Sequence, residues 1–67
     1  MRISYNKLWK LLIDREMNKH DLKVAAGISY ASVAKLGKCE NITTDVLLKI
    51  CEALHVHLDE IMETIDD

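Results

Sequence analysis

Residues 18–36 read NKHDLKVAAGISYASVAKL, and the local signals in this stretch decide the fold. The first residue is asparagine, which caps helices well, and an aspartate three positions later favours a helix N-terminus. We therefore predict a short helix over residues 19–26. Gly27 can adopt the left-handed conformation that ends a helix, and Ser29 can cap a further helix over residues 30–36.

The predicted helix over residues 30–36 has one face that the core does not need. Val33 and Leu36 lie on one face, which leaves Tyr30, Ala31 and Lys35 outside it, together with the small Ala34. Two short helices, joined by a glycine-containing turn of about three or four residues, form a helix-turn-helix. Such a unit places its second helix in the major groove of DNA.

Three further segments have helical periodicity. Residues 5–16 have apolar side chains three and four apart, with Ser4 as a candidate cap, and residues 44–54 show the strongest repeat, capped by Thr43 or Thr44. Residues 38–42 are expected to form a loop. Residues 58–65 also match the helical period, through Leu58, Ile61, Met62 and Ile65. We therefore expect an all-α fold, a compact five-helix bundle, with residues 1–67 forming one domain.

The composition limits the class of protein. A chain of 67 residues, 49% of them hydrophobic and 30% charged, without proline, favours a small packed helical domain. No apolar run approaches the roughly 20 residues that cross a bilayer, and residues 1–7 lack the apolar stretch of a secretion signal. We expect a cytoplasmic protein without a membrane partner, with both cysteines reduced.

The charge is distributed unevenly along the chain. Residues 1–38 carry eight lysines and arginines against three acidic side chains, a net charge of +5, whereas residues 39–67 carry one lysine against eight acidic side chains, a net charge of −7. The total of −2 hides this asymmetry. A basic half on an acidic body suits a domain that binds a polyanion on one face.

The 18–36 stretch, followed by TDVLLKICEAL at residues 44–54, resembles the Cro and phage-repressor type of helix-turn-helix regulators, the XRE family. The most specific parts are Leu22, Gly27-Ile28-Ser29, Val33 and Leu36 at their mutual spacing. The resemblance implies a five-helix bundle of the lambda-repressor-like DNA-binding type, with the helix-turn-helix in its second and third helices. It also implies a transcriptional regulator, a repressor, that binds double-stranded DNA as a homodimer.

The same resemblance implies roles for individual residues. Base contacts fall to Tyr30, Ala31 and Lys35 on the recognition helix. Contacts to the DNA backbone fall to a second set that lysine, hydroxyl and amide chemistry suits to phosphate oxygens, namely Lys19, Ser29, Ser32, Lys38 and Asn41.

This recognition helix lacks the arginine, glutamine and asparagine side chains that make paired base contacts, each worth about 1 to 3 kcal/mol. We therefore expect phosphates to supply most of the affinity and a dimer to supply selectivity. A dimer would set two recognition helices about 34 Å apart. Residues 1–4 and the last helix are both candidates for the contact between copies.

Other functions remain open. The same fold can serve as a protein-interaction module, such as an antitoxin whose acidic half binds a basic protein. Cys39 follows Lys38, whose charge would lower the pKa of a thiol, so a redox sensor is a third hypothesis. The histidines and cysteines lack the spacing of zinc sites, and nothing indicates catalysis, so we expect no metal, no cofactor, no small-molecule substrate and no enzymatic activity.

Overall fold

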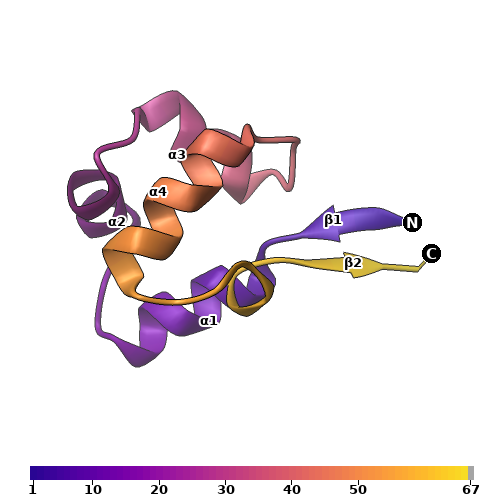
Figure 1. Ribbon diagram of the computed structural model, residues 1–67, viewed down its shortest axis with the longest axis horizontal. Coiled ribbons are helices and arrows are strands. Elements are labelled where there is room, and N and C mark those ends of the chain that lie inside the picture. The colour runs from indigo at the N-terminus through magenta and orange to yellow at the C-terminus, as the bar shows by residue number, and fades with distance from the viewer. Residues whose placement is uncertain (67) are drawn as a thin grey trace.

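The computed structural model describes residues 1–66 and shows four α-helices and one two-stranded sheet in this part of the chain (Figure 1). The elements follow one another in the order β1 (Arg2–Ser4), α1 (Asn6–Asp14), α2 (Lys19–Ala26), α3 (Tyr30–Gly37), α4 (Thr44–Leu54), the 3₁₀ turn η1 (Leu58–Glu60) and β2 (Glu63–Ile65).

The helices begin where capping side chains satisfy their free N–H groups. Asn18 and Asp21 cap each other: the Asp21 N–H donates to Asn18 Oδ1 at 2.8 Å, and the Asn18 N–H donates to Asp21 Oδ2 at 3.1 Å. Ser29 caps α3, and of the two threonines before α4, Thr43 is the cap. At α1 the prediction is one residue off, because Tyr5 occupies the cap position while Ser4 Oγ accepts the next free N–H at 3.2 Å.

Gly27 and Ile28 make the turn between α2 and α3. Gly27 has φ +65°, the left-handed conformation predicted for it, and its N–H donates to the Lys23 carbonyl at 3.0 Å. Ile28 is buried, and its N–H donates to the same carbonyl at 3.2 Å. The chain therefore leaves α2 in one direction only, and this direction sets the angle at which α3 starts.

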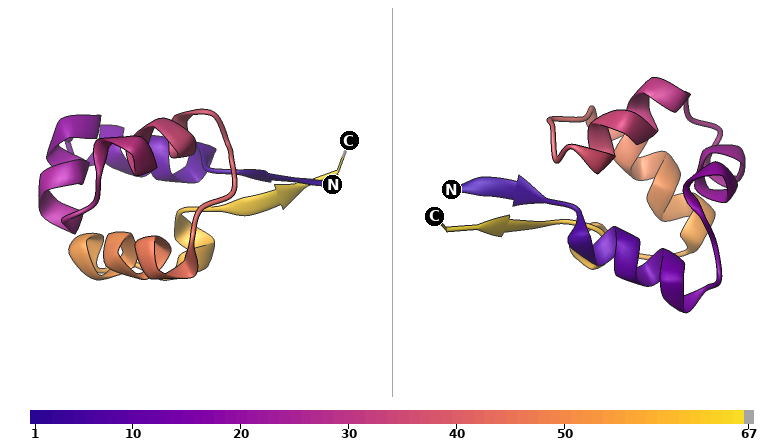
Figure 2. Two further views of the ribbon diagram at one scale, coloured as in Figure 1. Left: turned by 90° about the horizontal axis from the view of Figure 1, so that it is seen from above. Right: turned by 180° about the vertical axis from the view of Figure 1, so that it is seen from behind.

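The core lies between α4 on one side and α1, α2 and α3 on the other, as the left view of Figure 2 shows. Each helix contributes the apolar face that its periodicity predicts. The buried side chains are Tyr5, Leu8, Leu12, Leu22, Ile28, Val33, Leu36, Leu47, Ile50, Leu54 and Ile61. None of the helices within residues 1–66 is both long and apolar enough to cross a bilayer.

The expected fifth helix over residues 58–65 is wrong, and with it the all-α, five-helix description. After α4 the chain makes only η1 and then extends as β2, which pairs antiparallel with β1, Ile3 lying opposite Thr64. The two strands form a ribbon that extends away from the helices (Figure 1). The periodic spacing of apolar residues is real, but β-branched Thr64 and Ile65 also fit a strand, and a partner 61 positions away settles the choice.

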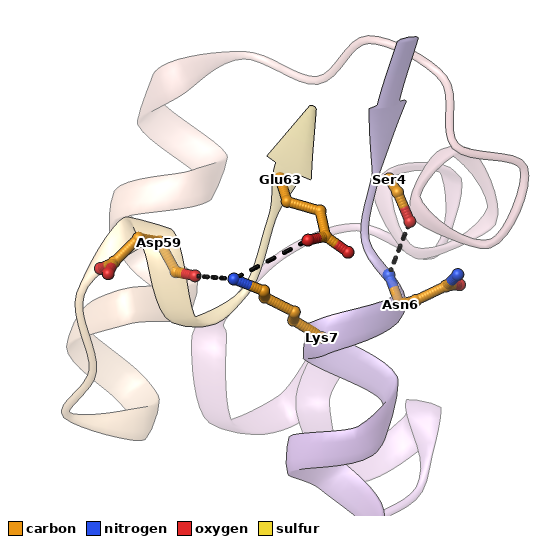
Figure 3. Close-up of polar contacts among 5 residues, drawn as sticks. All are labelled: Ser4, Asn6, Lys7, Asp59 and Glu63. Carbon is orange, nitrogen blue, oxygen red and sulfur yellow. Dashed lines mark hydrogen bonds and ion pairs between the residues drawn. The ribbon is translucent and has the colours of Figure 1, made fainter. Parts of the chain in front are cut away.

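Lys7 of α1 holds this terminal segment to the helices. Its Nζ donates to the Asp59 carbonyl at 3.2 Å and lies 3.9 Å from a carboxylate oxygen of Glu63, so one side chain contacts both η1 and the start of β2 (Figure 3). Ile61, between η1 and β2, is fully buried in the core. The end of the chain therefore closes the core without being helical.

This geometry distinguishes two apolar residues that a helix would have buried together. Ile61→Ala is expected to lower the free energy of unfolding by about 2 to 5 kcal/mol, because it leaves a cavity in the core. Leu58→Ala is the matched control and is expected to cost about 1 kcal/mol or less, because Leu58 is 42% exposed. Urea unfolding of both variants measures the difference, and equal losses would contradict the 3₁₀ turn and strand.

Candidate nucleic-acid interface

The outer face of α3 is free of the core. Val33 and Leu36 point inward and are buried, whereas Tyr30 is 75% exposed, and Ala31, Ala34 and Lys35 are also exposed. The predicted division of this helix into two faces is therefore confirmed. The face presents one aromatic ring, two methyl groups and one ammonium group to solvent, side by side on two turns of helix.

Ser29 and Ser32 lie together at the start of α3. Ser29 Oγ accepts the Ser32 N–H at 3.2 Å, and the two hydroxyl oxygens are 3.1 Å apart. Both hydroxyls are thus held by the cap itself at the positive end of the helix dipole. The two serines to which the resemblance gives backbone contacts therefore lie side by side next to the exposed face.

A hollow of about 360 Å³ runs along the side of α3 that faces α2. Lys19 from the first turn of α2 and Lys38 from the end of α3 both line it, although 19 positions separate them in the chain. The other residues that line the hollow are Tyr30, Val33, Ala34 and Gly37. Both lysines that were predicted to contact the DNA backbone therefore lie in one hollow, next to Tyr30, a predicted base-contact residue.

The loop after α3 is anchored from the other end of the molecule. Tyr5 is buried before α1, and its hydroxyl donates to the Glu40 carbonyl at 3.1 Å. Cys39 precedes that carbonyl in a left-handed conformation with φ +56°, and Asn41 follows it, exposed. The sequence assigned Tyr5 only to an apolar stripe, because no local signal shows which carbonyl its hydroxyl would reach.

Burial raises the pKa of Tyr5 above its ordinary value, and the nearby Cys39 raises it further. The pKa of Cys51 is also raised, by burial first and then by Glu60. Cys51 is half-buried on α4 and packs against the core. A raised pKa leaves less thiolate at neutral pH, so Cys51 is poorly suited to react with oxidants.

The helix-turn-helix carries a surplus of positive charge. Residues 19–38 hold four lysines and one aspartate. Lys23, Lys35 and Lys38 take part in no ion pair with other described residues, and Lys23 is half-buried beside His20 and Tyr30. By contrast, Glu63 pairs with Lys7, and a Glu60 carboxylate oxygen accepts the His57 N–H at 2.6 Å.

The cysteine and histidine side chains do not assemble a metal centre in the described part of the chain. No three side chains of His, Cys, Asp or Glu within residues 1–66 lie close enough to hold an ion, and Cys39 and Cys51 are free thiols. What residues 19–38 offer is an exposed helix face, two lysines in a flanking groove and a capped N-terminus.

A capped helix, a left-handed glycine turn and a second helix with a free outer face define the helix-turn-helix class. The family model described as the Cro/C1-type helix-turn-helix DNA-binding domain matches residues 7–67. The chain therefore belongs to this family, as the resemblance in its sequence implied.

A solved structure supports the same conclusion. The chain is similar to a protein described as the transcriptional regulator VanUg, with 53% sequence identity and a TM-score of 0.93. The likeness covers 98% of this chain and 88% of that one. No curated protein matches the chain.

The Tyr5 anchor gives a test by pH. Tyr5→Phe is expected to lower the free energy of unfolding by about 1 kcal/mol at pH 7, because the Glu40 carbonyl loses its donor. Since the folded-state pKa is raised, the folded chain holds the phenol proton more tightly than the unfolded chain, and this contribution is complete below about pH 10 and is lost as the pH rises beyond it.

The wild-type protein is therefore expected to lose stability above about pH 10 through a component that Tyr5→Phe lacks. Denaturant unfolding between pH 7 and 11 measures both effects. Tyr30→Phe is the control at pH 7, because its exposed ring should tolerate the change without loss of stability. Identical alkaline profiles of wild type and Tyr5→Phe would show that the Tyr5 hydroxyl is not held as described.

Proposed function

We propose that this protein is a transcriptional regulator, a repressor, that binds double-stranded DNA sequence-specifically with α3 in the major groove. The observation that carries the proposal is the exposed outer face of α3, bordered by lysines that have no acidic partner among the described residues. Membership of a DNA-binding family and similarity to a transcriptional regulator support it. Because binding requires no chemical reaction on the DNA, we propose that the protein is not an enzyme. We also propose that it is cytoplasmic.

The exposed side chains suit distinct contacts. We assign base contacts to Tyr30, Ala31 and Lys35: the methyl group fits a thymine methyl, and the ammonium group fits the acceptors of guanine. Ala34 lies on the same face and extends the apolar surface between them. Phosphate contacts go to the cations and hydroxyls at the border of this face and to the amide in the following loop, that is, to Lys19, Ser29, Ser32, Lys38 and Asn41.

We also propose that two copies bind together. The described chain measures 32 Å along its longest axis and carries one recognition helix, while adjacent half-sites on one face of DNA lie about 34 Å apart. The two candidate contact segments, residues 1–4 and residues 58–65, each contribute one strand to the same ribbon. A two-stranded sheet is marginal in water, and strands from a second copy would extend it, so we place the dimer contact at this ribbon.

Selection from a pool of random duplexes tests the whole proposal. We expect enrichment of a symmetric motif with two half-sites, because two copies related by a two-fold axis read the same bases twice. Binding should weaken steeply as salt rises, since phosphate contacts release counterions. A pool that never enriches would contradict sequence-specific binding, and an asymmetric motif would contradict the dimer.

Two lysine variants separate specific placement of charge from net charge. Lys38→Gln is expected to weaken binding to all duplexes alike and to reduce the slope of log K against log salt by about 1, because one phosphate contact is lost. Lys10→Gln removes the same charge from α1, where Lys10 lies beside Asp14, Asp59 and Glu60, and should leave the slope unchanged. Equal slopes for the two variants would remove Lys38 from the interface.

Charge reversal distinguishes DNA binding from the protein-interaction alternative. Lys35→Glu should abolish DNA binding, whereas an interaction module would be impaired by Glu60→Lys and Glu63→Lys instead. The structure weighs against the alternative, because both carboxylates already serve contacts within the chain.

A further inference from the structure

Trp9, the single tryptophan, lies against a lysine of the proposed interface. The Lys19 ammonium nitrogen is 5.0 Å from the centroid of the Trp9 ring and lies over its face. This is the arrangement of a cation–π interaction. Trp9 is half-buried: it packs against the core and leaves part of its side chain exposed. Lys19 of α2 makes its contact with this ring.

The end of α3 lies close to the same ammonium group. A Cβ atom placed on Gly37 would lie 3.4 Å from Lys19 Nζ, so the backbone of this last helical residue lies close beside the cation. A methyl group would just fit, and a longer side chain would compete for the space. The negative end of the α3 dipole is also at this point and favours a cation there.

The backbone of Lys19 is fixed as well. Lys19 is the first residue of α2, directly after the Asn18 cap whose two hydrogen bonds define where the helix starts. Lys19 lines both the recess next to Trp9, Leu12 and Met17 and the hollow beside α3. Its Nζ lies close to Trp9 of α1 and to Gly37 of α3.

We infer that Trp9 is a positioning residue for DNA binding: with the end of α3 it forms a socket that holds the Lys19 ammonium group in the hollow beside the recognition helix, ready for a phosphate. The inference rests on the proposed function. A free surface lysine loses side-chain entropy when it binds a phosphate, and a lysine already ordered by the socket loses less. Trp9 thus increases affinity without touching the nucleic acid.

The socket itself is testable without DNA. The ring current of Trp9 should shift the NMR signals of the Lys19 methylene protons upfield in the free full-length protein. Trp9→Leu should abolish the shift, and Trp9→Phe should keep a smaller one, because a phenyl ring is the weaker partner for a cation. Signals at ordinary positions in the wild-type protein would overturn the inference.

A double-mutant cycle tests the consequence on the duplex enriched by selection. Trp9→Leu should weaken binding about two- to fivefold when Lys19 is present, the range expected for an exposed cation–π contact. The same change should have no effect in a Lys19→Gln background. In a Lys23→Gln background, the matched control on α2, the full effect of Trp9→Leu should remain.

Equal losses in the wild-type and Lys19→Gln backgrounds would mean that Trp9 acts through general packing, and no loss in either would mean that the socket does not aid binding; both overturn the inference. If Trp9→Leu does not fold, Trp9→Phe takes its place in the cycle, with a smaller loss expected only when Lys19 is present. A wild-type protein that binds no duplex contradicts the proposed function instead, while the NMR shift still decides whether the socket exists.

Discussion

The constraint on which the rest of the structure depends is the sharp exit from α2 through Gly27. Because Gly27 is left-handed and Ile28 is buried immediately after it, α3 must start at one angle, with Val33 and Leu36 turned to the core. The outer face of α3 is exposed as a direct result. No side chain on that face belongs to the core, so its chemistry is free to serve binding.

Around that face the chain supplies fixed points from distant parts of the sequence. Tyr5, before α1, holds the loop after α3 by its hydroxyl, and Trp9, on α1, lies against the lysine that opens α2. The first fourteen residues therefore do more than fill the core. They set the positions of the two segments that border the recognition helix, the start of α2 and the loop that carries Asn41.

The strands β1 and β2 and the turn before β2 complete the fold with only a few residues. Residues 58–65 have the apolar spacing of a helix, but residues 63–65 form a strand because a partner strand is within reach. β1 provides that partner, and Lys7 ties the junction to α1. Ile61 then completes the core from a turn, so the bundle is sealed with few residues.

Local sequence signals are enough to predict α2, the turn, α3 and α4, together with the exposed face of the recognition helix. These features depend on caps, a left-handed glycine and apolar repeats, all of which act within a few residues of one another. The β1–β2 ribbon, the Tyr5 anchor and the Trp9–Lys19 contact depend instead on how the whole chain packs. Each joins residues 10 to 63 positions apart, and one-dimensional periodicity carries no information about which distant groups meet, because packing of the whole chain sets those distances.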